Sequence, residues 1–187
     1  MLKKKSLFLQ SLQEMKKVSC ITLLAMMGAI SIVLGYFTFM PVETIKITFN
    51  FLPNEFVYYL FGPAVGALYG AALDLLTFFI RPTGTLFYGF TISAILTGLW
   101  YGALLYQRPL SLKRILITKL IFSIAVHIFL NTYWLTILYG YDFFALLPVR
   151  ALKTAIVFPF ETLLLYSLIN RAEATGIIRK IKGAGAH

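Results

Sequence analysis

The sequence predicts an all-α integral membrane protein with six transmembrane helices and both termini in the cytoplasm. Of the 187 residues, 59% are hydrophobic and 13% are charged, about half the charged share of a soluble domain. The mean hydropathy is +0.83. The apolar stretches are long and do not alternate with polar residues, which favours helices over the strands of a membrane barrel. Lys and Arg gather in short segments between these stretches, as they do in the cytoplasmic loops of membrane proteins.

The elements follow in order along the chain. A basic segment, 1–17, is predicted as a cytoplasmic tail ahead of a six-helix membrane domain over 18–170. A second cytoplasmic tail is predicted over 171–182, and the Gly-Ala-rich end, 183–187, is typical of a cloning remnant. Within the membrane domain, the apolar stretches lie at about 18–39, 52–80, 86–106, 115–138 and 148–169.

The stretch 52–80 decides the number of crossings. It could form one long tilted helix, or two helices broken at Gly62-Pro63. Most of the 17 Lys and Arg residues lie in three segments, 1–17, 107–114 and 171–182. All three face the cytoplasm only if an even number of crossings separates each pair, so we expect 52–80 to cross twice. The second helix of the chain is then short or irregular, because 52–61 is too short for an ordinary span.

Motifs for several kinds of chemistry are absent from the sequence. It contains no Gly-x-x-x-x-Gly-Lys phosphate loop and no His-Glu-x-x-His motif. Cys20 is the single cysteine, so we expect no intramolecular disulfide, no metal site and no cofactor. No Ser/His/Asp arrangement stands out, and we predict no catalytic residues. The net charge of +10 belongs to the predicted cytoplasmic segments, so we expect the lipid bilayer, and not nucleic acid, as a partner.

Polar and aromatic residues gather near the predicted outer side of the membrane. With the N-terminus inside, the outward loops are 40–51, 81–87 and 139–147. Near these loops lie Lys46, Phe49, Arg81, Phe87, Tyr88, Asn131, Trp134, Tyr139, Arg150 and Lys153. Ionisable groups in a membrane span are costly and usually mark a functional site.

The spacing of these residues predicts that several of them meet. His127, Asn131 and Trp134 fall on one face of a helix, and Arg150 and Lys153 are neighbours on the last helix. Aromatic rings, an amide and several cations that converge at one face suit a flat, aromatic, anionic small molecule. We therefore predict a binding site for such a molecule.

Several of these residues also fit plainer roles. Arg81 and Trp134 are typical of membrane-interface anchors, and a lone histidine such as His127 usually packs in the core. We expect Lys119 to extend its ammonium group to the inner membrane interface. Hydrogen bonds between helices are expected of two carboxylates, Asp74 and Glu161.

Small residues recur at helical spacing along three predicted helices. Ala25 and Ala29 form a pair on the first helix. Longer rows follow on the third and fourth helices, at Gly62, Gly66, Gly70 and Asp74 and at Ala94, Gly98 and Gly102. Such rows let helix backbones approach closely in lipid. We expect packing within the chain, and a docking surface for a partner subunit is the alternative.

The order of these motifs resembles the substrate-binding S components of energy-coupling factor (ECF) vitamin transporters, most closely the folate-specific ones. The part widely shared among S components is Gly62-Pro63-Ala64-Val65-Gly66-Ala67-x-x-Gly70-x-x-x-Asp74-Leu75-Leu76. The resemblance continues in Arg81-Pro82-x-Gly84 and Gly89-Phe90-Thr91-x-Ser93-Ala94-x-Leu96-x-Gly98. Its more folate-specific motifs are Leu130-Asn131-Thr132-x-Trp134-Leu135 and Pro148-x-Arg150, followed by Lys153 and Pro159. Together these motifs cover about 18–170.

The resemblance implies a subunit of an ATP-driven importer in a bacterial cell membrane. Folate would be captured at the outer face and delivered inward. Ala25-x-x-x-Ala29 would dock against a membrane-spanning coupling subunit, and two ATPase subunits would hydrolyse ATP. The chain itself would not be an enzyme. Family members often carry a proline before the glycine where this chain has Phe87-Tyr88-Gly89, so the course of the loop 81–90 is left open.

The resemblance also implies three roles in folate recognition. Hydrogen bonding to the pterin edge is expected of Asn131 and Asp74. Stacking on the ring is expected of Trp134, Phe87 and Phe49. Contact with carboxylates or ring acceptors is expected of Arg81, Arg150 and Lys153.

Two other functions stay open at this stage. The same scaffold could bind a different vitamin. A membrane enzyme or a structural subunit is the alternative outside transport; the first predicts product formation by the isolated chain, and the second predicts no saturable ligand.

Overall fold

The computed structural model describes residues 6–42, 45–82, 86–178 and 181. The predicted remnant, 183–187, lies outside the described residues. The elements are α1 (Leu7–Glu14), α2 (Val18–Tyr36), β1 (Thr38–Val42), β2 (Ile45–Thr48), α3 (Phe51–Phe61), α4 (Pro63–Ile80), α5 (Tyr88–Leu105), α6 (Leu112–Phe122), the π-helix η1 (Ser123–Leu130), α7 (Asn131–Tyr139) and α8 (Phe143–Ala174).

The helical membrane class is confirmed. Among the described residues, 5 helices are long and apolar enough to cross a membrane: α2, α4, α5, the continuous helix Leu112–Tyr139 and α8. The helix α3 has only 11 residues, which agrees with the prediction of a short second helix. The segment predicted as an N-terminal tail contains α1, and α8 continues a turn beyond the predicted end of the membrane domain.

The break between α3 and α4 lies at Gly62, as the sequence predicted. Gly62 has φ 85°, a left-handed conformation that favours glycine, and Pro63 then opens α4 at a position where no backbone N–H is needed. The Ser11 hydroxyl of α1 donates to the carbonyl oxygen of Phe61 at 2.6 Å and accepts the N–H of Val65 at 3.0 Å. One buried serine thus satisfies backbone groups that the break exposes on both helices.

The loop predicted over 40–51 contains most of a β-hairpin, which the sequence analysis did not predict. β1 and β2 form an antiparallel hairpin in which Thr38 is paired with Thr48 and Phe39 with Ile47. The register shifts between Phe39 and Val42, around Pro41, because proline cannot donate a ladder hydrogen bond. The hairpin leads directly into α3.

The rows of small residues on α4 and α5 pack against each other. A Cβ added at Gly66 would lie 2.8 Å from the Gly98 carbonyl oxygen, and one at Gly70 would lie 2.6 Å from that of Ala94. Side chains larger than glycine would therefore force these two backbones apart. This finding confirms packing within the chain for both rows.

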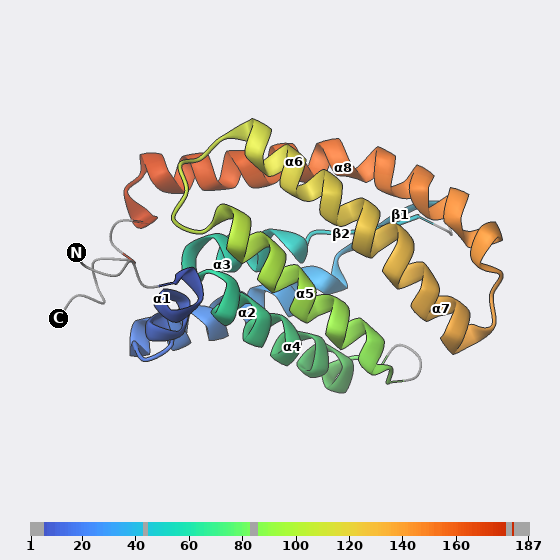
Figure 1. The fold of residues 1–187 in the computed structure, drawn as a ribbon, viewed down its shortest axis with the longest axis horizontal. Helices are drawn as coiled ribbons and strands as arrows, with labels where there is room; N and C mark the ends of the chain where they lie inside the picture. Colours follow the sequence, from blue (N-terminus) through green and yellow to red (C-terminus); the bar gives the residue numbers. More distant parts are fainter. Residues whose placement is uncertain (1–5, 43–44, 83–85, 179–180, 182–187) are drawn as a thin grey trace.

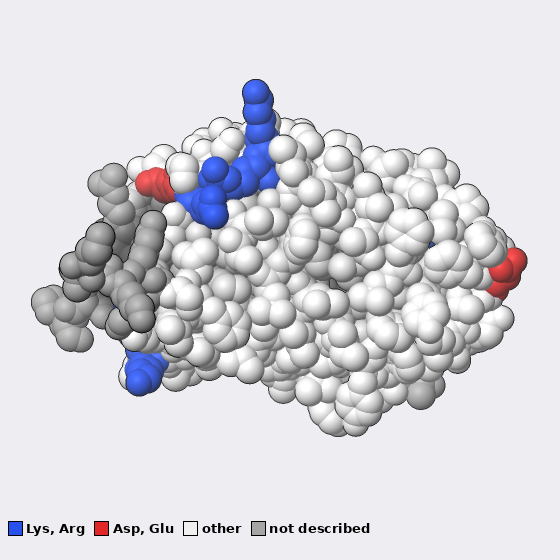
Figure 2. Space-filling model, in the orientation of Figure 1, with Lys and Arg blue, Asp and Glu red and all other residues white. Residues whose placement is uncertain are grey.

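The helices form two layers (Figure 1). One layer holds α6, η1, α7 and α8, and the other holds α1 to α5. The beginning of the described chain, the end of α8 and the α5–α6 connection lie at the same end of the molecule. On the face drawn in Figure 2, Lys and Arg side chains gather toward that end, and a broad middle region carries no exposed charge.

Candidate binding site

Two adjoining hollows lie between the layers. The α5 hollow, of about 350 Å³, is lined mainly by α3, α4 and α5 together with Val126, His127 and Asn131. The α8 hollow, of about 230 Å³, is lined by the end of the hairpin, α3, η1 and one face of α8. Their shared walls are Asn50, Phe51, Glu55 and His127. A ligand could therefore extend from one hollow into the other.

The α8 hollow carries the cations. Arg150, Lys153, Thr154, Val157, Phe158 and Glu161 line it. Their spacing of three and four residues places them on one face of α8. One terminal nitrogen of the Arg150 guanidinium (Nη1) is buried and has no hydrogen-bond partner within the described part of the chain. Since an unsatisfied buried charged donor is costly, this nitrogen indicates a place for an anionic ligand group.

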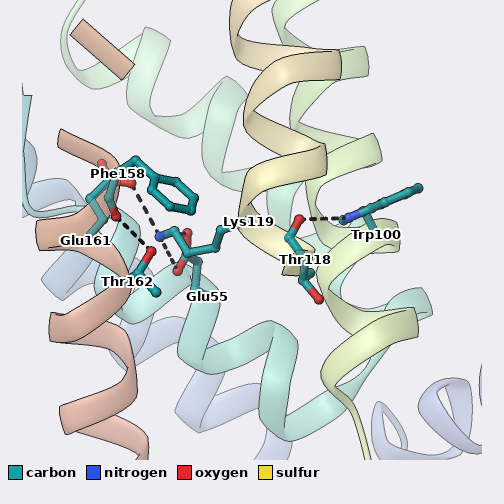
Figure 3. A network of polar contacts seen from close by, with 7 residues as sticks. All are labelled: Glu55, Trp100, Thr118, Lys119, Phe158, Glu161 and Thr162. Atoms are coloured by element: carbon teal, nitrogen blue, oxygen red, sulfur yellow. Dashed lines mark hydrogen bonds and ion pairs between the residues drawn. The ribbon is translucent and has the colours of Figure 1, made fainter. Parts of the chain in front are cut away.

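A buried ion cluster forms part of the wall of this hollow (Figure 3). The ammonium group of Lys119 lies 2.8 Å and 3.0 Å from the two carboxylate oxygens of Glu55. It also lies 3.3 Å from Glu161. Lys119 is only 1% exposed, so the prediction that it extends to the membrane interface is wrong. Two carboxylates within reach stabilise its charge inside the protein, which removes the need to reach water.

Ser93 is the hydrogen-bonding centre of the α5 hollow. Its hydroxyl donates to the Asn131 side-chain oxygen at 2.8 Å and accepts the indole N–H of Trp134 at 3.2 Å. Asp74, on the neighbouring helix α4, accepts a hydrogen bond from the hydroxyl of Thr91 on α5 at 2.7 Å. This hollow therefore carries polar groups within a largely apolar and aromatic wall, and their hydrogen bonds join neighbouring helices.

Aromatic rings extend this region toward the 81–87 loop. Phe87 packs edge-on against Trp134 with ring centroids 5.6 Å apart, and against Phe90 at 5.9 Å. A third hollow of about 230 Å³, the loop hollow, is lined by Asp74, Thr77, Phe78, Arg81, Leu86, Phe87, Phe90 and Tyr139. It adjoins the α5 hollow through Asp74, Thr77 and Phe90.

Arg81 stands apart from the other predicted cations. Its side chain is exposed, its guanidinium lies 5.1 Å from the centre of the Tyr36 ring, and it donates to the Gly35 carbonyl at 3.3 Å. It lines the loop hollow, whereas Arg150 and Lys153 line the α8 hollow. The predicted cations therefore occupy two different places.

The remaining predicted residues fall as follows. Asp74 and Asn131 line the α5 hollow, and Trp134 contacts its wall through Ser93. Phe49 is half-buried beside Asn50 but is not among the residues that line these three hollows. The side chain of Lys46 lies outside the described part of the structure.

Glu55 and Ser93 were not among the predicted site residues. Glu55 lines both main hollows and carries the ion cluster. It is a single carboxylate in an otherwise apolar and aromatic stretch, and that alone is a signal of a functional or paired charge. Ser93 had no comparable signal, because an isolated serine in an apolar helix commonly bonds to its own backbone.

The outer surface of α2 offers a second candidate site. Ala25 and Ala29 are both exposed. Large apolar neighbours on the same helix are also exposed, with Val18 at 78% and Met26 at 58% of their surface accessible. This small-residue surface faces away from the protein interior, where lipid or another subunit could contact it.

Helices that cross the membrane around a partly polar internal hollow define a membrane protein that binds a small molecule. The family model of the ECF transporter substrate-specific component matches residues 19–172, and the chain belongs to this family. It is therefore a multi-pass membrane protein and the substrate-binding subunit of a transporter, not an enzyme.

Individual relatives are similar over most of the chain. The folate transporter FolT of Clostridium novyi (strain NT) is 34% identical over 167 residues, which cover 89% of this chain and 97% of the relative. The folate transporter FolT of Leuconostoc mesenteroides subsp. mesenteroides is 28% identical over 165 residues, covering 85% and 89%. A crystal structure of FolT bound with folic acid matches with a TM-score of 0.75 and 29% identity, over 82% of this chain and 94% of that one.

Proposed function

We propose that this chain binds folate at the outer face of the membrane and delivers it inward as part of an ATP-driven ECF importer. The main support for this proposal is the buried Nη1 of Arg150, which has no hydrogen-bond partner among the described residues. A buried charged donor of this kind is stabilised when an anionic group binds to it. The α8 hollow around it continues into the aromatic and amide-lined α5 hollow. Two relatives are named folate transporters, which supports the same ligand.

The two hollows suit the two ends of folate. We place the glutamate carboxylates in the α8 hollow, where Arg150 and Lys153 carry charge that complements them. The flat pterin ring then occupies the α5 hollow, where Asn131 and Asp74 offer hydrogen-bonding groups to its edge.

Aromatic contacts complete the proposed site. Trp134 and Phe87 pack edge-on at the border of the α5 hollow, where a ring could stack on them. Phe49 lies beside the hairpin end of both main hollows and is proposed as a third ring contact. Arg81 is proposed to act from the loop hollow, at the margin of the site, and to contribute least.

A ligand panel tests the assignment. Purified chain is heated in detergent with folate, with other water-soluble vitamins, or with none. Folate at 100 times its dissociation constant should stabilise the fold by about 2.7 kcal/mol and raise the melting temperature accordingly. If another vitamin raised the melting temperature and folate did not, that vitamin would be assigned as the ligand in place of folate. No response to any vitamin, together with product formation, would indicate an enzyme.

The proposal includes six spans with both termini in the cytoplasm. The five long helices need α3 as a sixth crossing to bring the ends of the chain to one side. Lys and Arg side chains gather at the end of the molecule where the described chain begins and α8 ends, which supports a cytoplasmic location for that end. Protease should remove N- and C-terminal epitope tags in inside-out vesicles and leave both in right-side-out vesicles. Cleavage of one tag in each preparation would require an odd number of spans.

The small-residue surface of α2 is proposed to dock against a membrane-spanning coupling subunit, with two ATPase subunits completing the transporter. The exposed Ala25 and Ala29 allow the close approach that such docking needs. Ala29→Trp should abolish uptake into cells and leave folate binding by the purified chain within about twofold, since α2 position 29 faces outward. The matched control is Ala103→Trp, an exposed alanine on α5, which should retain both. Normal uptake by Ala29→Trp would remove α2 as the docking surface.

A further inference from the structure

The α8 hollow contains carboxylates as well as cations. Glu55 and Glu161 line it together with Arg150 and Lys153. Two free carboxylates would repel an anionic ligand and would compete with it for the cations, because charges interact strongly in a cavity shielded from water. The hollow nevertheless leaves Nη1 of Arg150 without a hydrogen-bond partner among the described residues.

Lys119 accounts for this arrangement. It projects from α6 and is not among the residues that line either main hollow. Its ammonium group contacts both oxygens of Glu55 and one oxygen of Glu161, at 2.8, 3.0 and 3.3 Å (Figure 3). The positive charge of Lys119 therefore partly neutralises both carboxylates.

We propose that Lys119 is a positioning residue for ligand binding, which holds Glu55 and Glu161 away from Arg150 so that its guanidinium stays available to the acidic end of the ligand. The inference rests on the proposed function, because it needs an anionic ligand in the α8 hollow. A purely structural cluster that joins α3, α6 and α8 is the competing explanation. The two explanations make different predictions for a variant without Lys119. A positioning role predicts a larger loss of affinity for anionic than for neutral ligands, and a structural role predicts equal losses.

The test compares folate with a pterin that lacks an acidic tail. Lys119→Met keeps the length of the side chain and removes its charge, so two carboxylates remain uncompensated in the hollow. Folate affinity should fall by roughly tenfold or more, whereas the affinity for the neutral pterin should fall by less than about threefold. The matched control is Lys113→Met at the exposed start of α6, which should change neither.

Neutralising the carboxylates should rescue the defect. In the triple variant Glu55→Gln/Lys119→Met/Glu161→Gln, folate affinity should return to within about threefold of wild type, because no uncompensated charge is left. Two results would establish the structural role and overturn the proposal. One is a triple variant that binds folate as weakly as Lys119→Met does, and the other is an equal loss of affinity for folate and for neutral pterin in Lys119→Met.

A single substitution keeps the test decisive if Lys119→Met does not fold. Glu161→Gln leaves the Lys119–Glu55 pair intact and removes one negative charge from a partly exposed position. Folate affinity should then rise by roughly threefold or more, with no change for neutral pterin. An unchanged or lower folate affinity would contradict the proposal. Wild-type protein that binds no folate would instead refute the proposed function, and with it this inference.

Discussion

The α5 and α8 hollows are built in opposite ways. In the α5 hollow the polar groups satisfy one another, with Ser93 joining Asn131 to Trp134. In the α8 hollow, the Arg150 guanidinium has a buried nitrogen without a partner in the described chain. In our proposal, the α5 hollow is therefore organised before a ligand arrives, whereas the α8 hollow is completed by the anionic group of the ligand.

This difference predicts unequal contributions to binding. A hydrogen bond to a charged group is worth about 1.5–3 kcal/mol, and a neutral one about 0.5–1.5 kcal/mol. Substitutions in the α8 hollow should therefore cost more affinity than those in the α5 hollow. Substitutions of the cations in the α8 hollow should also weaken only those ligands that have a carboxylate group.

The largest effect is expected from Arg150→Ala. Removing the guanidinium deprives the ligand carboxylate of its charged partner, so folate affinity should fall roughly ten- to hundredfold in equilibrium binding measurements. Arg150→Lys should recover part of the loss, because it restores charge without the two-pronged geometry. Unchanged folate affinity in Arg150→Ala would place the acidic end of the ligand elsewhere.

A smaller effect is expected from Asn131→Ala. The amide is a neutral partner of the pterin edge, so its loss should weaken folate and acid-free pterin alike, by roughly three- to tenfold. The comparison control is Thr136→Ala, also half-buried, on the same helix α7 and outside the three hollows. A loss restricted to folate would show that Asn131 contacts the acidic end, contrary to the proposed orientation.

The smallest effect is expected from Arg81→Ala. Its guanidinium is exposed and already lies against Tyr36 and the Gly35 carbonyl, so water screens its charge. Folate affinity measured in the same assay should change by less than about twofold. A loss comparable to that of Arg150→Ala would mean that the loop hollow, and not the α8 hollow, receives the carboxylates.

Much of the fold could be predicted because its signals are local. Gly62-Pro63 marks the break between α3 and α4, since glycine permits the left-handed conformation at the break and proline cannot continue the preceding helix. The hairpin was not predicted because Pro41 interrupts β1, whose residues do not alternate between polar and apolar.

The site could be predicted only in part, because its pairings join distant segments. The contact between Glu55 and Lys119 spans 64 residues of sequence, and a lone lysine in an apolar helix fits both an interface and a buried pair. Arg150 and Asn131 were predicted as site residues because each is a polar residue near the outer end of an apolar helix, with polar or aromatic neighbours on the same helix face. Their division between two hollows required the structure.

Calorimetric titration of the wild-type and Arg150→Ala chains, each with folate and with acid-free pterin, tests the central claim most directly. We predict saturable folate binding to the wild type, tighter than pterin binding. We further predict that Arg150→Ala removes most of the advantage of folate and changes pterin affinity by less than about twofold. Wild-type protein that binds folate no better than pterin, or a variant that loses both ligands equally, would contradict the assignment of the α8 hollow to the acidic end of the ligand.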